Sequence, residues 1–266
     1  MVLGLSTYAF FWQWSDRVSA PISLERMLQK TADLDVELFQ ICDYPQVEQR
    51  SDDELRALRG YADDLGIRLE LGTRGVKPAH LRRYLHIAEL LGATIVRSMF
   101  NTADQRPSAA EAEELLREAL PDFEKAGVTI ALETYEQVPS ATLVDVVTRI
   151  GSDSLGICSD PANCVAALEN PSDVIDRVAP HVANMHIKDF AFTRQDGWVG
   201  FSLVGAPLGE GLLDYDAMIG AVRPDERGIN QIIEHWLPWQ GDEETTCRME
   251  DEWTAHNVRY VRSKQQ

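Results

Sequence analysis

Short apolar runs alternate with amphipathic segments along the whole chain. The apolar runs span four to six residues, which is typical of strands in a parallel sheet covered by helices. The segments between them repeat apolar residues at helical spacing, which indicates helices with one buried face. No linker rich in glycine, serine or proline divides the chain. The pattern therefore predicts an α/β protein in which strands and helices follow one another in turn.

Eight of the apolar runs are predicted strands. They cover residues 2–6, 37–42, 67–71, 94–97, 128–132, 155–158, 182–187 and 229–234. Helices are predicted around residues 24–34, 51–65, 78–91, 108–125, 141–150, 173–178, 215–222 and 253–258. Ser51, with Glu54 three residues further on, has the spacing of a capping box at a helix start.

These strand–helix units average about 33 residues over a chain of 266 residues, which is the length of one βαβ step. Eight such strands that close on themselves form a (β/α)8 TIM barrel, a fold of about 250 residues. We therefore expect a single TIM-barrel domain over residues 1–266. A doubly wound open sheet is the alternative, but the first strand is not followed by a GxGxxG motif.

The candidate chemistry lies at the C-terminal ends of the strands, where TIM barrels carry their active sites. The fifth to eighth predicted strands deliver, in order, Glu133, Asp160, His186 and Glu234. Each residue alone has an ordinary explanation, such as a helix cap or a hydrogen-bonded core histidine. Together, three carboxylates at one barrel mouth would repel one another unless a divalent cation lies between them. This sulfur-free donor set favours Mn²⁺, with Mg²⁺, Co²⁺ or Zn²⁺ as alternatives.

Further polar side chains fall near the same rim. Gln40, Arg97, Asn163 and Lys188 lie on or just after four of the predicted strands. We expect Arg97 and Lys188 to be functional, because an anionic cluster needs nearby cations if it is to hold an anionic substrate.

Other rim positions have a more ordinary interpretation. Tyr8 and Arg74 follow the first and third strands, and Glu70 and Asp189 are expected to be structural. The long segment 191–213 contains Arg194 and the glycine-rich stretch VGAPLGEG. It is predicted to be either a lid over the site or a surface excursion.

The net charge of the chain disfavours some classes of binding partner. The 43 acidic and 25 basic residues give a net charge of −18, which argues against binding to nucleic acids and to anionic membranes. No segment is long and apolar enough for a membrane span, and no basic residues precede an apolar start as in a secretory signal. The four cysteines form no CxxC pair, so we expect free thiols in the cytoplasm.

Five motifs resemble those of the xylose isomerase-like TIM-barrel superfamily, which includes sugar isomerases and epimerases. They are ALE at 131–133, SDPAN at 159–163, MHIKDF at 185–190, GAPLGEGLLDY at 205–215 and IIEHW at 232–236. The resemblance implies the same four metal ligands, with Glu133 and Glu234 as the acid–base pair of the ketose 3-epimerase branch. The chain departs from that branch at Pro139, where the epimerases have glutamate, and at Asn163, where many members have histidine.

A closer likeness is to 3-oxo-isoapionate decarboxylase-like members of the superfamily. The shared motifs are QICD at 40–43, ELGTRG at 70–75 and HIKDF at 186–190, followed by Arg194. Those members often have Asn-His after the first glutamate, where this chain has Thr134 and Tyr135.

The leading hypothesis is a divalent-metal-dependent isomerase or epimerase that acts on a small sugar or keto-sugar through a metal-bound enediolate. Glu133 and Glu234 would move the proton beside the carbonyl, and Lys188 would stabilise the charged oxygen. Substrate contacts, including those to a carboxylate or phosphate, would come from Arg97, Arg194, Asn163 and Gln40.

The alternative hypothesis is a metal-dependent decarboxylase of a 3-oxo sugar acid, in which loss of CO₂ gives the same enediolate. An endonuclease-four-type DNA repair enzyme is disfavoured by the acidic charge, and a non-catalytic sugar-binding barrel by the intact ligand set. Four tryptophans could line a pocket or contact a second subunit: Trp12, Trp14, Trp236 and Trp239. Assembly into a homo-oligomer is therefore an open alternative.

Overall fold

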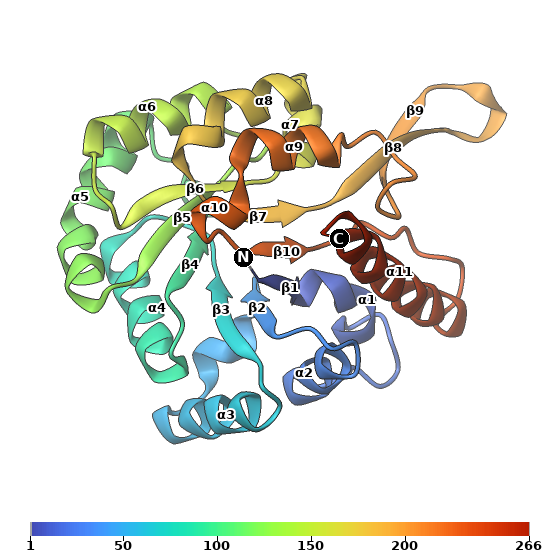
Figure 1. The fold of residues 1–266 in the computed structure, drawn as a ribbon, viewed down its shortest axis with the longest axis horizontal. Coiled ribbons are helices and arrows are strands. Elements are labelled where there is room, and N and C mark those ends of the chain that lie inside the picture. Colours follow the sequence, from blue (N-terminus) through green and yellow to red (C-terminus); the bar gives the residue numbers. More distant parts are fainter. Residues whose placement is uncertain (1, 266) are drawn as a thin grey trace.

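Eight parallel strands close into a barrel in the computed structural model, which describes residues 2–265 (Figure 1). The strands are β1 (Leu3–Ser6), β2 (Leu38–Cys42), β3 (Arg68–Gly72), β4 (Ile95–Ser98), β5 (Thr129–Glu133), β6 (Leu155–Ser159), β7 (Val182–Ile187) and β10 (Gln231–Ile233). Around the barrel they follow the order β1, β10, β7, β6, β5, β4, β3, β2, and β2 pairs with β1. The predicted TIM barrel is confirmed, and the predicted strand ends differ from the observed ones by at most two residues.

Helices surround the barrel on its outer side (Figure 1). The α-helices are α1 (Phe11–Trp14), α2 (Leu24–Ala32), α3 (Asp52–Asp64), α4 (Pro78–Leu91), α5 (Ala109–Ala126), α6 (Ser140–Ile150), α7 (Pro161–Cys164), α8 (Pro171–Val178), α9 (Tyr215–Val222), α10 (Pro224–Arg227) and α11 (Glu243–Lys264). Short 3-10 helices are η1 (Thr7–Phe10), η2 (Pro45–Gln49), η3 (Val165–Ala167), η4 (Ala179–His181) and η5 (Asp196–Trp198). Every predicted helix is present, whereas the short helices α1, α7 and α10 were not expected.

Local sequence signals explain where the longer helices begin and end. The predicted capping box at the start of α3 is confirmed, because the Ser51 side chain accepts from the Glu54 backbone while Glu54 accepts from the Ser51 backbone. Helix α4 begins at Pro78 and ends at Leu91. Gly92 caps it with a φ of 70°, a left-handed conformation that glycine adopts without strain.

The segment after β7 forms an antiparallel hairpin of β8 (Asp189–Arg194) and β9 (Phe201–Ala206), which extends away from the barrel in Figure 1. The Asp189 carboxylate anchors the chain that returns from it. This carboxylate accepts hydrogen bonds from the backbone N–H groups of Gly209, Gly211 and Leu213 at 2.9, 3.0 and 2.9 Å. The expected structural role of Asp189 is therefore confirmed, and the hairpin is a surface excursion.

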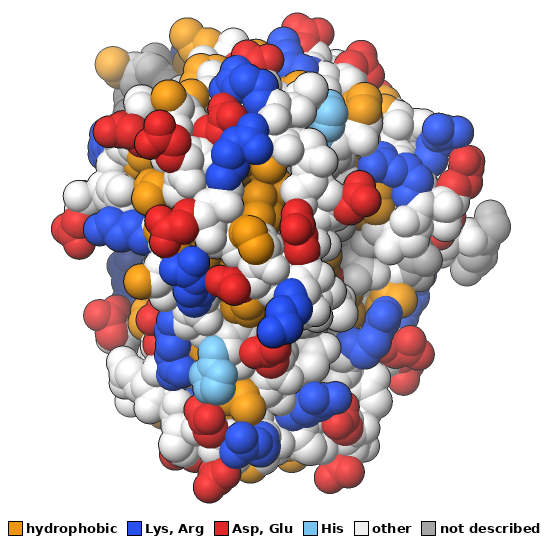
Figure 2. All heavy atoms as spheres, turned by 90° about the vertical axis from the view of Figure 1, so that its left-hand side faces the viewer, with side chains coloured by type: hydrophobic (Ala, Val, Ile, Leu, Met, Phe, Trp, Pro, Cys, Tyr) orange, Lys and Arg blue, Asp and Glu red, His pale blue; other side chains and the backbone are white. Residues whose placement is uncertain are grey.

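The surface charge is mixed on the face over α5 and its neighbours. Figure 2 shows acidic and basic side chains interleaved there, with no single-sign patch. Ion pairs tie the helices together on this side, such as Arg82 on α4 with Asp122 on α5 at 2.7 Å. Within residues 2–265 no helix combines the length and the apolar composition needed to cross a membrane.

Candidate active site

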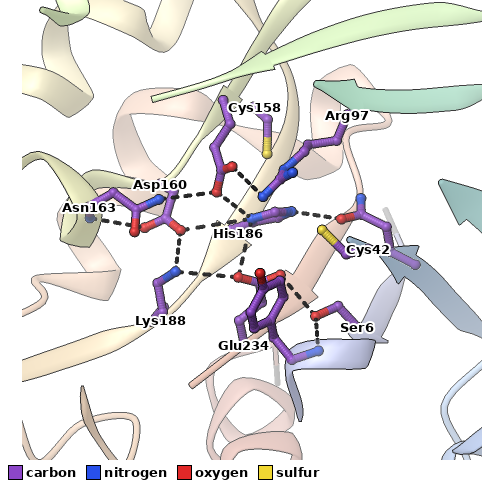
Figure 3. Close-up of polar contacts among 12 residues, drawn as sticks. Ser6, Cys42, Arg97, Cys158, Asp160, Asn163, His186, Lys188 and Glu234 are labelled. Atoms are coloured by element: carbon purple, nitrogen blue, oxygen red, sulfur yellow. Dashed lines mark hydrogen bonds and ion pairs between the residues drawn. The ribbon is translucent and has the colours of Figure 1, made fainter. Parts of the chain in front are cut away.

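Four neighbouring strands bring the candidate metal ligands together. In the barrel order β5, β6, β7 and β10 lie side by side, and they supply in turn Glu133, Asp160, His186 and Glu234. All four side chains are buried, and one ligand atom from each lies within 4.8 Å of the other three. Figure 3 shows Asp160, His186 and Glu234 pointing toward one another from their separate strands. We call these four residues the ligand cluster.

His186 lies at the centre of the ligand cluster. Its Nδ1 atom is 3.1 Å from Glu133 Oε1, 3.4 Å from Glu234 Oε2 and 3.8 Å from Asp160 Oδ2. On the other side of the ring, Nε2 is 2.8 Å from Gln40 Oε1, an oxygen that can only accept. Gln40 therefore holds the proton on Nε2 and leaves Nδ1 directed at the carboxylates, the arrangement that orients metal-binding histidines.

Two buried cations partly neutralise the carboxylates. Lys188 Nζ is 2.6 Å from Asp160 Oδ2 and 3.3 Å from Glu234 Oε2, and Arg97 Nη2 is 2.5 Å from Glu133 Oε2. Burial alone would lower the pKa of Lys188, but the charges of Asp160 and Glu234 raise that pKa above its usual value. In return, Lys188 overcomes the effect of burial on Asp160 and holds the pKa of that carboxyl below its usual range. The cluster is therefore strongly charged despite its burial.

The donor atoms of the ligand cluster fit a divalent cation. Three carboxylates and one imidazole form a hard-to-borderline donor set. Glu133 Oε2 and Asp160 Oδ2 are buried and touch a cationic side chain, yet neither makes a hydrogen bond of regular geometry. Cys42 also lies near His186 and Glu234, but burial raises the pKa of its thiol well above the usual range, which disfavours a thiolate ligand. The buried cluster is thus consistent with a divalent metal site made of oxygen and nitrogen ligands.

A cavity of about 200 Å³ opens above the ligand cluster. Its lining residues are Tyr8, Arg74, Arg97, Met99, Glu133, Tyr135, Glu136, Gln137, Asn163, Lys188, Glu234 and Trp236. Pockets for drug-sized ligands measure roughly 300–1,000 Å³, so this cavity suits a smaller molecule. The polar side chains among its walls suit a substrate with several hydroxyl or carboxylate groups.

Residues 28–264 match the family described as xylose isomerase-like TIM barrel. The chain belongs to this family. It is 56% identical over 261 residues to the 3-oxo-isoapionate decarboxylase of Pectobacterium atrosepticum, which spans 98% of this chain and 95% of that protein. As a member of the xylose isomerase-like family, the chain is an enzyme of a sugar-metabolising group.

Two solved structures share this fold at low sequence identity. One is D-psicose 3-epimerase with D-tagatose from Clostridium cellulolyticum H10, with a TM-score of 0.76, 14% identity and 99% of both chains covered. The other is a xylose isomerase-like TIM barrel protein from Mycobacterium smegmatis in complex with magnesium, with a TM-score of 0.70 and 18% identity over 97% of this chain and 96% of that one. Both confirm the family's barrel architecture.

The xylose isomerase-like barrel brings most, but not all, of the predicted site residues to the cavity. Arg97, Asn163 and Lys188 line it beside the ligand cluster, and Asn163 Nδ2 donates to Glu133 Oε1 at 3.1 Å. Gln40 is fully buried, and its side chain contacts His186 and does not line the cavity. Arg194 lies on the hairpin, where its guanidinium stacks over Trp198 at 5.0 Å and Phe201 at 4.4 Å and does not line the cavity.

Tyr8 and Arg74 are two of the lining residues that had no role assigned from the sequence. Tyr8 and Arg74 follow different strands, and both contact Asp43, with Tyr8 Oη donating to Asp43 Oδ2 at 3.0 Å and Arg74 Nε at 3.0 Å. Their positions just after strands one and three were the available signal. The sequence could not show that Tyr8 and Arg74 both donate hydrogen bonds to the same carboxylate, that of Asp43.

Proposed function

We propose that this chain is a metal-dependent decarboxylase that releases CO₂ from a small 3-oxo sugar acid. The observation that carries the proposal is the 56% identity over 98% of the chain to a 3-oxo-isoapionate decarboxylase. This relative supports decarboxylation better than the isomerase or epimerase activity that the motifs put first. The site chemistry described below is compatible with that choice.

Glu133, Asp160, His186 and Glu234 would hold the metal, with Mn²⁺ as the expected ion and Mg²⁺, Co²⁺ or Zn²⁺ as alternatives. The solved Mycobacterium smegmatis relative is described with magnesium, which supports an ion of this class. A bound divalent cation supplies Lewis-acid chemistry, drawing electrons from a carbonyl and a neighbouring hydroxyl.

The side chains around the ligand cluster supply charge and a proton. When the bond to the carboxylate breaks, CO₂ leaves and the electron pair moves toward the carbonyl oxygen. Lys188 keeps its ammonium proton and lies at the cavity wall, so it stabilises negative charge on that oxygen. A proton must then be added to the carbon that lost CO₂. The Lys188 ammonium would supply it through Glu234, whose Oε2 lies 3.3 Å from Nζ, and Lys188 would regain a proton from water. Glu133 is held in place by Arg97 and Asn163.

The charges around the cavity admit an anionic substrate once a cation is bound. The carboxylates of the ligand cluster, Asp43 and Glu136 outnumber the cations Arg74, Arg97 and Lys188 by two. A divalent cation would cancel that excess when His186 is neutral. The net repulsion between the site and a sugar acid would thereby be removed.

The test is to load the purified protein with Mn²⁺ and to incubate it with branched and linear 3-oxo sugar acids. The expected result is CO₂ release with formation of one equivalent of the ketose. A coupled assay measures the CO₂, and NMR identifies the ketose. D-Tagatose serves as the comparison substrate for epimerisation. Epimerisation of D-tagatose without CO₂ release from any 3-oxo acid would contradict the proposal and favour an epimerase.

A further inference from the structure

The two cations nearest the ligand cluster are already engaged with protein carboxylates. Arg97 is 3% exposed, and its Nη1 donates to Asp43 Oδ1 at 3.1 Å and to the Thr73 carbonyl at 2.9 Å, while its Nη2 contacts Glu133. Lys188 is divided between Asp160 and Glu234 and packs over the Trp236 ring at 4.4 Å. Both stabilise the ligand cluster itself, so neither is free to form a two-pronged contact with a substrate carboxylate.

Arg74 is the cation at the cavity wall that keeps donors available. Its Nε donates to Asp43 Oδ2 at 3.0 Å, while its Nη2 lies 2.9 Å from the same oxygen and donates to the Tyr8 hydroxyl at 2.9 Å. The Nη1 atom has no hydrogen-bond or ion-pair partner within residues 2–265, and the side chain is 54% exposed. A guanidinium held by Asp43 and Tyr8 through Nε and Nη2 leaves Nη1 open, and this group can donate a charge-assisted hydrogen bond to a carboxylate.

Asp43 fixes this orientation and has an unusual backbone. It follows β2 with a φ of 48°, a left-handed conformation that is strained for a non-glycine residue. Its Oδ1 accepts from Arg97, and its Oδ2 accepts from Tyr8 and Arg74. The Asp43 carboxylate therefore couples Arg74, at the cavity wall, to Arg97, which contacts Glu133 of the ligand cluster.

We infer that Arg74, oriented by Asp43 and Tyr8, binds the carboxylate of the substrate and makes the site select a sugar acid over a neutral ketose. This inference rests on the proposed decarboxylation, which supplies the acid as substrate. The carboxylate then lies at the Arg74 side of the cavity, and the oxygens that meet the metal lie over the ligand cluster. After CO₂ leaves, the neutral product has lost its contact with Arg74, which favours its release.

The experiment compares Arg74→Ala and Arg74→Lys with wild-type protein under Mn²⁺ saturation. A charged hydrogen bond is worth about 1.5–3 kcal/mol, so we expect Arg74→Ala to raise KM for the acid by about 10- to 100-fold with a smaller change in kcat. Arg74→Lys should recover part of the loss, because it restores the positive charge but not the contacts with Asp43 and Tyr8 that orient the guanidinium. Inhibition by the neutral ketose product should stay unchanged, a result that a collapsed site would not give. Arg56→Ala is the matched control, since Arg56 is 57% exposed and ion-paired to Asp53 on the outer helix α3.

A binding measurement separates this inference from the proposed reaction. Calorimetry with D-ribonate and D-ribulose as probes should show that wild-type protein prefers the acid and that Arg74→Ala loses this preference. That result supports the role of Arg74 even if no CO₂ release is found, in which case only the proposed reaction fails. Wild-type protein that binds D-ribonate no better than D-ribulose, or Arg74→Ala with an unchanged KM for the acid, overturns the inference even if CO₂ release is confirmed.

Discussion

Two buried polar clusters lie at opposite ends of the same strand, and their different chemistry shows what the cavity end is built to do. Asn230 precedes β10 and belongs to the first, in which Glu70 accepts from Asn230 at 2.7 Å, Asn184 at 3.0 Å and Gln40 at 3.1 Å. Glu234 follows β10 and belongs to the ligand cluster. The Glu70 network has one carboxylate and three amide donors, whereas the ligand cluster has three carboxylates around one imidazole.

The comparison distinguishes Glu70, whose hydrogen bonds come from neutral amides of the protein, from the crowded carboxylates of the ligand cluster. Burial raises the pKa of Glu70, and neutral amides supply its hydrogen bonds, while no Lys or Arg among residues 2–265 forms an ion pair with it. Asp160 is as deeply buried, yet the charge of Lys188 holds its pKa below the usual range. A satisfied carboxylate stabilises the fold. Carboxylates that are crowded and kept ionised need a further cation, which is the physical basis for the metal proposal.

The largest expected effect comes from removing one charge of the ligand cluster. Glu133→Gln and Glu234→Gln should lower CO₂ release by about 10²–10⁴-fold, because an amide is a poorer metal ligand and cannot carry a proton. Isothermal titration with Mn²⁺ measures the loss of metal affinity, and assays under metal saturation measure the loss of CO₂ release. Glu118→Gln, on the exposed surface of α5, is the control. Full activity with unchanged metal binding in either variant would remove the assignment of the ligand cluster.

The next effect is on stability and comes from the other cluster. Glu70→Ala removes this acceptor from two buried amides, Gln40 and Asn184, and from the partly buried Asn230, and each buried group left unsatisfied costs about 1–3 kcal/mol. We expect the free energy of unfolding to fall by about 2 kcal/mol or more, measured by urea denaturation, while Mn²⁺ still binds. If Glu70→Ala instead abolished Mn²⁺ binding and left stability intact, the two clusters would not differ in the way described.

A smaller effect should come from Gln40, which contacts both the Glu70 network and the ligand cluster. Its Nε2 donates to Glu70 and its Oε1 faces His186 Nε2. Gln40→Ala removes the partner that orients His186, and changes of this kind lower metal affinity by about 10–100-fold. At saturating Mn²⁺ the KM of the substrate should be unchanged, with Gln29→Ala on the outer helix α2 as control. A raised KM with normal Mn²⁺ affinity would instead support the direct substrate contact expected from the sequence.

Residue spacing was enough to predict the barrel and to predict that the four residues of the ligand cluster lie close together. Each of its four members lies at a strand end, and neighbouring strands in a βαβ barrel end on the same rim. Depth along a strand was harder to predict. Gln40 lies in the middle of β2, so its side chain points inward but stays one layer below the cavity.

Contacts between distant segments were beyond the sequence pattern. The course of the hairpin that carries Arg194 depends on Asp189 accepting from backbone N–H groups about 20 residues later, at Gly209 and Gly211. The importance of Arg74 depends likewise on Asp43, which lies 31 positions earlier. Such pairings leave no periodic signal, because each joins residues from different structural elements.

The smallest effect concerns Glu250, a buried carboxylate outside the barrel whose surroundings resemble the Glu70 network. Glu250 on α11 accepts from the backbone N–H groups of Trp12 at 2.8 Å and Gln13 at 3.2 Å, and from the Gln13 side chain at 3.1 Å. Burial raises its pKa from the ordinary 4.5 to about 8 despite these donors. Between these two values the folded protein keeps a proton that the unfolded chain has lost, so stability falls as pH rises.

Urea denaturation at pH 6 and pH 7 tests this contribution. One proton corresponds to at most about 1.4 kcal/mol per pH unit, so the free energy of unfolding of the wild type should fall by up to that amount between the two pH values. Glu250→Gln removes the titrating group, and its stability should lack this part of the slope whatever its absolute value. Glu244→Gln, exposed at the start of α11, should keep the wild-type slope. Identical slopes in wild type and Glu250→Gln would mean that the three donors keep Glu250 ionised, and that amide-type donors outweigh burial at this site but not at Glu70.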